Sequence, residues 1–194
     1  MYTVIGPQKS RAMRVLWMLE ELGEPYEHIP AAPRSEEAVR YNPSGKVPAL
    51  LDGDAVLTDS MAIVTYLADK HGRLTAPAGT VARARQDALT FWLIDEMDAV
   101  LWAAAKHSFV LPEDLRMPAV KESLKAEFSA SAEKLSAMLD GPFLMGDSIS
   151  IPDILACHCI NWSVGAKFPR VDDRLFAYAK NLRERPAYQA AASR

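Results

Sequence analysis

The first seventy residues alternate between short apolar runs and segments with helical periodicity. Residues 2–5 form a β-rich run that Gly6 and Pro7 end. Apolar side chains then recur at the spacing of one helical face as far as Leu22, and Gly23 follows as a stop signal. Two further short segments are typical of a strand and a short helix, over residues 26–29 and 35–41. The pattern predicts a strand, a helix, a second strand and a second helix.

Two more strands and a third helix complete this half of the chain. The apolar runs 47–51 and 55–57 flank an Asp-Gly-Asp turn, which predicts a β-hairpin. Asp59 or Ser60 is expected to cap the next helix, which ends near Gly72. The order is β-α-β-α-β-β-α, in which the first strands can pair in parallel across a helix and the last two form an antiparallel hairpin. This order predicts an α/β thioredoxin-like domain over residues 1–72.

The rest of the chain has a helical period throughout. Residues 73–80 contain Pro77 and Gly79 and are expected to form a linker. Residues 81–194 are then expected to form an all-α helical bundle. Its helices are predicted at 81–109, 119–139, 151–164, 172–185 and after Pro186. The third of these segments is apolar almost all round, which is typical of a helix at the centre of a bundle.

Composition and charge narrow the choice of partner and compartment. The formal net charge is −3. Nucleic acid and anionic membrane surfaces both require clustered positive charge, so neither is expected as a partner. The chain shows no signal-peptide pattern and no apolar run that could span a bilayer. Its two cysteines, Cys157 and Cys159, point to nearly opposite sides of a helix and cannot easily pair, which favours a reducing cytoplasm.

Candidate metal ligands are not grouped in the sequence. The four histidines lack the spacing of a metal site, so no metal is expected. Cys157, His158 and Cys159 lie in the most apolar helix and are interpreted as core residues.

The most informative stretch is residues 42–50, followed by Asp59 and Ser60. Pro48 stands just before a strand, where it cannot donate to the ladder. If the Val47–Pro48 bond is cis, the Val47 backbone N–H and C=O face outward and can hold an extended ligand backbone. The start of the next helix favours a carboxylate, to which the Ser60 hydroxyl can donate, while Asp59 can accept from an ammonium. This pattern indicates a site for an amino-acid headgroup.

Over essentially its whole length, the chain resembles the cytosolic glutathione transferases of bacterial type. Asn42-Pro43-Ser44-Gly45-Lys46-Val47-Pro48, the Asp59-Ser60 pair and the Tyr66-Leu67-Ala68-Asp69 run match that family's glutathione site. The resemblance implies that Val47 and Pro48 meet the cysteinyl part of glutathione and that Asp59 and Ser60 bind its γ-glutamyl end. It also implies that Lys46 and Arg34 reach the glycyl carboxylate. Ser150 and Asp153 match the family's buried-helix start as a capping box.

The family places a Ser, Tyr or Cys at the start of the first helix, where it meets the glutathione sulfur. Ser10 is the only hydroxyl residue between Gly6 and Val15, and it is identified as the catalytic residue. The usual position in serine-type relatives corresponds to Lys9, so Lys9, a backbone N–H and an ordinary cap role for Ser10 stay open. Lys9, Arg11 and Arg14 are nearby positive charges with either an electrostatic or a structural role. The loop has no cysteine, which disfavours mixed-disulfide chemistry.

The resemblance implies conjugation of the glutathione thiolate to small electrophiles, with a role in detoxification and with glutathione as substrate rather than cofactor. It also implies a homodimer, with contacts on the 59–70 helix and on residues 83–100. The electrophile is expected between the two domains, in a pocket formed by Trp102, Lys106, Phe109 and Trp162. Glutathione peroxidase activity can accompany this conjugation. An isomerase or dehalogenase reaction on the same fold and a non-catalytic glutathione-binding module stay as alternatives.

Overall fold

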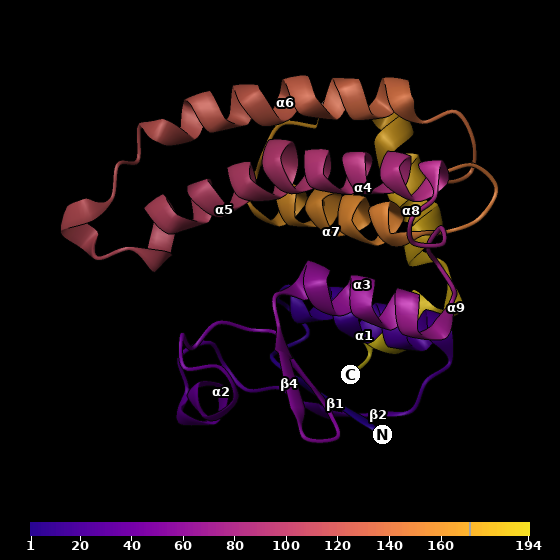
Figure 1. Ribbon diagram of the computed structural model, residues 1–194. Helices are drawn as coiled ribbons and strands as arrows, with labels where there is room; N and C mark the ends of the chain where they lie inside the picture. The colour runs from indigo at the N-terminus through magenta and orange to yellow at the C-terminus, as the bar shows by residue number, and fades with distance from the viewer. Residues whose placement is uncertain (171) are drawn as a thin grey trace. The chain divides into compact units, whose positions relative to one another are not determined.

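A computed structural model of the protein describes residues 1–170 and 172–194 (Figure 1). The chain forms two compact units, residues 1–80 together with 183–194, and residues 81–182. The first unit is a thioredoxin-like α/β fold and the second is helical. The predicted fold class is therefore confirmed.

The first unit has a four-stranded mixed sheet in the order β2-β1-β3-β4. Strand β1 pairs parallel with β2 and antiparallel with β3, and β3 pairs antiparallel with β4. The predicted element order is confirmed, with these bounds: β1 Tyr2–Ile5, α1 Ala12–Leu22, β2 Tyr26–Ile29, α2 Glu36–Tyr41, β3 Ala49–Asp52, β4 Ala55–Thr58 and α3 Ser60–His71.

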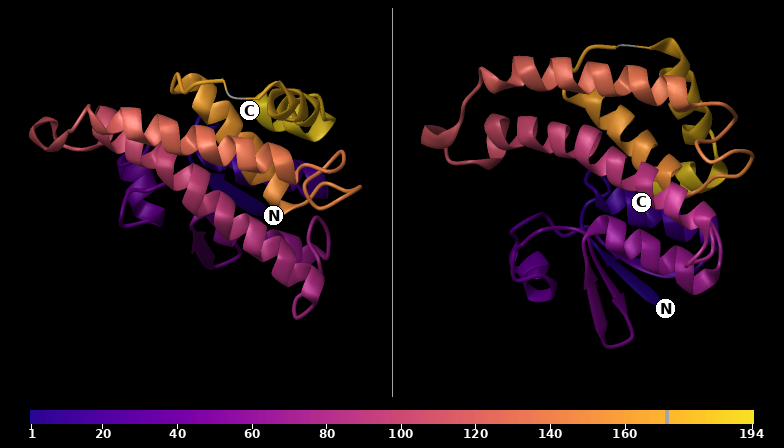
Figure 2. Two further views of the ribbon diagram at one scale, coloured as in Figure 1. Left: turned by 90° about the horizontal axis from the view of Figure 1, so that it is seen from above. Right: turned by 45° about the horizontal axis from the view of Figure 1, so that its top comes forward.

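Both faces of this sheet are covered, which explains why consecutive residues in its central strand are apolar. Val4 and Ile5 are each fully buried. Helices α1 and α3 pack together over one face (Figures 1 and 2), and α2 contributes Ala38 to a second cluster with Ile5 and Ala49. Because the sheet is buried on both faces, the positions of its strand ends are fixed. The loops that leave those ends carry the candidate glutathione-site residues named in the sequence analysis.

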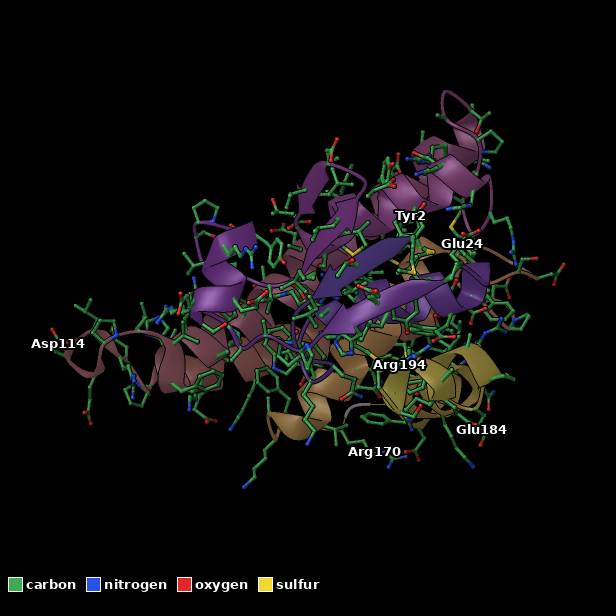
Figure 3. The ribbon with its side chains drawn as sticks, turned by 90° about the horizontal axis from the view of Figure 1, so that it is seen from below. Tyr2, Glu24, Asp114, Arg170, Glu184 and Arg194 are labelled. Atoms are coloured by element: carbon green, nitrogen blue, oxygen red, sulfur yellow. The ribbon has the colours of Figure 1, made fainter. Side chains whose placement is uncertain are left out.

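The last helix, α9 (Pro186–Ala192), packs on α1 in the first unit. Trp17 and Tyr188 meet edge to face with ring centroids 5.0 Å apart, and Arg185 pairs with both carboxylate oxygens of Glu21, at 2.6 and 2.7 Å. Arg194, labelled in Figure 3, donates to Glu20 at 2.9 Å. The sequence assigned residues 81–194 to one helical domain. In the structure, residues 183–194 instead belong to the first unit. The sequence could not show this, because the helical period of the last segment does not reveal which partner its apolar face contacts.

These contacts also close a small polar cluster at the edge of the first unit. The Tyr26 hydroxyl donates to Glu20 at 2.7 Å. Burial, together with this bond to a carboxylate, raises the pKa of Tyr26 to about 12. Tyr26 is a neutral donor at physiological pH, as an ordinary tyrosine is, and the raised pKa extends this neutral form further into the alkaline range.

The second unit begins with one continuous helical run rather than a uniform α-helix. It comprises α4 (Val81–Leu93), the π-helical η1 (Ile94–Asp98), α5 (Ala99–Ala105) and the π-helical η2 (Lys106–Val110). The sequence predicted a single helix over 81–109, and the structure adds two π segments to it. A short 3₁₀ turn, η3 (Glu113–Leu115), leads to α6 (Val120–Met138). Helix α6 runs alongside the continuous helical run in Figures 1 and 2.

Helix α7 (Ile151–Gly165) is the buried helix that the sequence predicted, and α8 (Asp173–Arg183) follows it. The capping box at the start of α7 is confirmed: Asp153 is fully buried and accepts from the Ser150 backbone N–H at 2.8 Å. Cys157 and Cys159 are fully buried in α7, as expected for core residues. Across residues 1–170 and 172–194, every helix is too short or too polar to cross a membrane.

Candidate functional site

The start of α3 presents an exposed carboxylate and a buried hydroxyl side by side. Asp59 is the N-cap, with φ 69°, and its Oδ1 accepts from the backbone N–H groups of Met61 at 2.9 Å and Ala62 at 3.1 Å. The sequence left the cap open between Asp59 and Ser60, and the structure assigns it to Asp59. Because Oδ1 takes both bonds, Oδ2 can accept from a ligand cation.

Ser60 accepts a hydrogen bond from a buried arginine. It is 3% exposed, and its Oγ accepts from Arg14 Nη1 at 3.1 Å. Arg14, on α1, is itself only 2% exposed. Since Ser60 Oγ is the acceptor in this bond, its own proton remains available for donation. The guanidinium also adds positive charge to the positive end of the α3 dipole, which favours a bound carboxylate.

Sequence reasoning left the role of Arg14 undecided, whereas the structure connects it directly to the site. The signal was present in the sequence: Arg14 is the one charged residue in the run from Ala12 to Leu19, whose members are all buried. A charged side chain on a buried helix needs a partner, because burial without one is costly. The sequence could not show that Ser60, 46 positions away, is such a partner.

Val47 lies against the loop that leads to α1. A Cβ placed on Gly6, which has φ 131°, would stand 2.9 Å from Val47 Cβ, so only glycine permits this approach. The Val47–Pro48 bond is cis, the condition on which the sequence expectation depended. Among the described residues, none forms a hydrogen bond with the Val47 backbone N–H or C=O. An extended ligand backbone can therefore pair with it.

The two cations assigned to the glycyl end belong to adjoining loops. The Arg34 backbone N–H donates to the Gly45 carbonyl at 2.8 Å, and a Cβ on Gly45 would stand 3.0 Å from Arg34 Cα. Asn42 Nδ2 donates to the Lys46 carbonyl at 2.9 Å and fixes the same turn. Arg34 and Lys46 are both exposed. The structure therefore joins the backbones of the two loops that carry Arg34 and Lys46, and it leaves both side chains exposed.

Ser10 makes local hydrogen bonds at the entrance to α1. Its Oγ donates to the Pro7 carbonyl at 2.7 Å and accepts from the Ala12 backbone N–H at 3.1 Å. These bonds close the turn before the first helical residue, as a capping hydroxyl would. Lys9 beside it is exposed. Ser10 can donate to a ligand sulfur only by releasing the Pro7 carbonyl.

These features converge because three contacts tie separate segments of the first unit together: Arg14 with Ser60, Gly6 with Val47, and Arg34 with Gly45. The set offers an acceptor for an ammonium, donors for two carboxylates and an unpaired stretch of backbone. That arrangement suits a short peptide with an amino-acid headgroup at one end and a carboxylate at the other.

The expected second-substrate residues separate into two groups. Phe109 and Trp162 line a cavity of about 260 Å³ within the second unit, and Phe168 joins them. Trp102 and Lys106 are not among the residues that line this cavity. The lining residues of α5 begin with Leu101 and Ala104, so residues 102 and 106 fall on a neighbouring face of the helical run.

His107, next to the Lys106 just described, makes a structural contact. His107 Nδ1 accepts from the Met117 backbone N–H at 3.2 Å, which ties η2 to the segment before α6. Within the part of the chain that the structure describes, no group of three or more His, Cys, Asp and Glu side chains could hold a metal ion.

Comparisons with known proteins agree with the geometry of the first unit. Residues 10–70 match the family model described as "Glutathione S-transferase, N-terminal domain". Glutathione S-transferase 4 of Zea mays is 30% identical over an alignment of 206 positions, which spans 97% of this chain and 88% of the maize protein. Human glutathione S-transferase theta-1 is 32% identical over 139 residues, 68% of this chain and 58% of the human protein. The matched part is therefore less than two thirds of the human relative's length.

A solved structure resembles both units. The theta class glutathione S-transferase from Xanthomonas axonopodis pv. citri, with glutathione bound, has a TM-score of 0.79 and 27% identity. The comparison covers 100% of this chain and 97% of the Xanthomonas chain.

Proposed function

Because this chain belongs to the glutathione S-transferase family, we propose that it is an enzyme that binds glutathione in its first unit and transfers the thiolate to small electrophiles. The observation that carries the proposal is the start of α3, where Asp59 and the Arg14-backed Ser60 stand side by side. This pair suits both charges of the γ-glutamyl headgroup. Glutathione then acts as a substrate, and the reaction needs no separate cofactor.

The remaining contacts follow from the chemistry of the tripeptide. The γ-glutamyl carboxylate accepts from Ser60 Oγ, and its ammonium donates to Asp59 Oδ2. The cysteinyl backbone pairs with Val47 beside Pro48, as an added strand would. Lys46 and Arg34 meet the glycyl carboxylate as exposed cations, whose individual contributions are small. Affinity therefore depends mainly on the α3 end of the site.

Activation of the thiol is assigned to Ser10. A thiol has an ordinary pKa of about 8.5 and is mostly protonated at neutral pH. A hydroxyl that donates to the thiolate favours the charged form, and one such bond contributes about 1.5–3 kcal/mol, or roughly one to two pKa units. Exchange of the Pro7 carbonyl for a thiolate is favourable, because a charge-assisted hydrogen bond is stronger than a neutral one. Lys9 and the backbone N–H groups that open α1 are the competing activators.

The alternative hypotheses are other reactions of the same thiolate and binding without any reaction. Peroxidase, isomerase and dehalogenase chemistry would all use the same glutathione site, whereas a binding module would use it without turnover. The engagement of Ser10 with Pro7 is the observation that favours a binding module. The assembled set of Arg14, Ser60, Asp59 and Val47 supports glutathione binding, which an enzyme and a binding module share, so turnover decides between them.

We also propose a homodimer in a reducing, cytoplasmic compartment, with a role in detoxification. Val81 and Phe91 on α4 are 70% and 65% exposed, and Tyr66 on α3 is 36% exposed. Large apolar side chains at such positions suit a two-fold contact with a second copy. Cys157 and Cys159 form no disulfide, which fits a reducing environment.

The test combines binding with turnover. Calorimetry should detect glutathione binding to the full chain, and a panel of aryl halides, epoxides and hydroperoxides should reveal thiol conjugation or peroxide reduction. Binding with turnover on an aryl halide or epoxide supports a transferase. Binding without any turnover identifies a binding module, and absence of binding overturns the proposal.

A further inference from the structure

His28 on β2 forms a hydrogen bond with the loop that leads from β1 to α1. Its Nε2 lies 2.8 Å from the carbonyl oxygen of Gly6. A carbonyl oxygen can only accept, so Nε2 is the donor and carries the proton in this contact. The bond crosses from the edge strand β2 to the end of the neighbouring strand β1. A histidine without any sequence signal therefore contacts the loop that carries Ser10.

Both backbone polar groups of Gly6 are bound by β2. The Gly6 N–H donates to the Ile29 carbonyl at 2.9 Å, and the Gly6 carbonyl accepts from His28, the preceding residue on the same strand. Gly6 is buried, and a buried carbonyl that loses its donor is costly. Its φ of 131° is one that side-chain-bearing residues rarely adopt. Together these features fix the point at which the chain leaves the sheet.

The position of Gly6 determines the placement of the residues around it. A Cβ built on Gly6 would lie 2.9 Å from Val47 Cβ and 3.2 Å from Ala12 Cβ, so Gly6 is close to the first residue of α1. Pro7 follows with a restricted φ, and its carbonyl accepts from the Ser10 backbone N–H at 3.0 Å. A shift of Gly6 would therefore move the turn that carries Ser10.

We propose that His28 is a positioning residue for activation of the thiol, an inference that rests on the proposed function. It holds Gly6 and acts through the turn that follows, and not on the sulfur itself. Lys9, Ser10 and the backbone N–H groups that open α1 all follow Gly6 in this turn, so their placement depends on Gly6 whichever of them acts. A misplacement of about 1 Å near the reacting atoms can lower a rate roughly a hundredfold.

The contact itself is tested in the full chain without glutathione. A long-range proton–nitrogen NMR spectrum should show the His28 proton on Nε2. Amide hydrogen exchange at Ser10 and Ala12 should become about tenfold faster in His28→Ala, because the turn is released. His28→Gln, whose side-chain amide keeps a donor, should restore slow exchange. A wild-type His28 that is protonated only on Nδ1, or unchanged exchange in His28→Ala, would overturn the proposal.

Titration of bound glutathione connects the contact to the chemistry. In His28→Ala the thiol pKa should rise by about 0.5–1 unit and kcat should fall roughly tenfold. KM for glutathione should change less than about threefold, because Asp59 and Ser60 still hold the headgroup. His28→Gln should recover most of both losses. His71→Ala is the matched control: His71 is also half-buried and bonds to the Tyr2 hydroxyl at 2.9 Å, at the opposite end of β1, so it should change neither quantity.

The outcomes separate this role from the proposed function. A wild-type protein that does not bind glutathione refutes the function and the role of His28 with it. Wild-type binding and turnover, with the same thiol titration in His28→Ala, refute the role of His28 alone. Equal losses in His28→Ala and His71→Ala indicate general destabilisation and also refute that role.

Discussion

Arg14 on α1 donates to the hydroxyl oxygen of Ser60, the first residue of α3, at 3.1 Å, and both residues are almost fully buried. The bond joins two helices that lie far apart in the sequence. It also decides how Ser60 can act, because an oxygen that accepts from a guanidinium keeps its own proton for another partner. A buried cation thereby fixes the direction of a donor at the proposed glutathione site.

Ser60→Ala should weaken both glutathione binding and the fold. Loss of a charge-assisted bond to the ligand should reduce affinity by about 1.5–3 kcal/mol, which is roughly tenfold or more. Arg14 also loses one buried partner, which should lower the free energy of unfolding by about 1–3 kcal/mol. Ser131→Ala is the matched control, because Ser131 is equally buried and donates to Glu96 in the other unit at 2.9 Å. Calorimetry should show unchanged glutathione affinity for that control.

Asp59 has two roles that a pair of variants can separate. Asp59→Ala removes both the N-cap and the charge, so it should cost about 1 kcal/mol of stability and weaken glutathione binding. Asp59→Asn keeps an oxygen for Met61 and Ala62 and should be nearly as stable as the wild type. It should still lose affinity, because its amide cannot pair with an ammonium. Wild-type affinity in Asp59→Asn would remove the carboxylate from the site.

The role of Ser10 can be read from the titration of bound glutathione. If its hydroxyl stabilises the thiolate, Ser10→Ala should raise the thiol pKa by about one unit or more, with little change in affinity. Turnover near neutral pH should fall roughly tenfold or more, since the thiolate is the nucleophile. Thiolate absorbance followed against pH measures the shift. Lys9→Ala is tested alongside, and a shift in that variant alone would assign activation to Lys9 and leave Ser10 as a cap.

Gly6→Ala tests the approach of the α1 loop to Val47. The added methyl would stand 2.9 Å from Val47 Cβ at a backbone φ of 131°, so the loop must move away. We expect a loss of about 1–3 kcal/mol of stability together with weaker glutathione binding. Gly79→Ala, also at positive φ but with no atom within 4 Å of the added Cβ, should lose about 1 kcal/mol of stability from backbone strain alone and leave binding unchanged. Thermal denaturation and calorimetry measure the two effects.

Phe91→Glu should convert the proposed dimer into a monomer. The ring is 65% exposed on α4, and a charge there opposes burial in an apolar contact. Sedimentation velocity at micromolar concentration measures the mass. Leu115→Glu, at an equally exposed apolar position in η3, should leave the assembly unchanged. A wild-type protein that sediments as a monomer would refute the dimer outright.

Local order could be predicted from the sequence alone. The strand and helix order followed from apolar periodicity and from stop signals such as Gly23 and Gly72, both of which cap helices at positive φ. The Ser150–Asp153 capping box was predicted for the same reason, since both partners lie within one helical turn. These features depend on residues a few positions apart, whose geometry is set by backbone sterics and local hydrogen bonds.

Tertiary packing alone decided which distant residues meet. The partner of Arg14, the attachment of α9 to α1, and the pairing of Arg34 with Gly45 all join segments whose own periodicity leaves their partners open. The same holds for the cavity, which requires Leu101, Lys121 and Trp162 to converge from three helices and which excludes Trp102 although it adjoins Leu101. A helical pattern shows which face is apolar. The opposing surface depends on how whole elements pack, and that is settled by burial and shape across the fold.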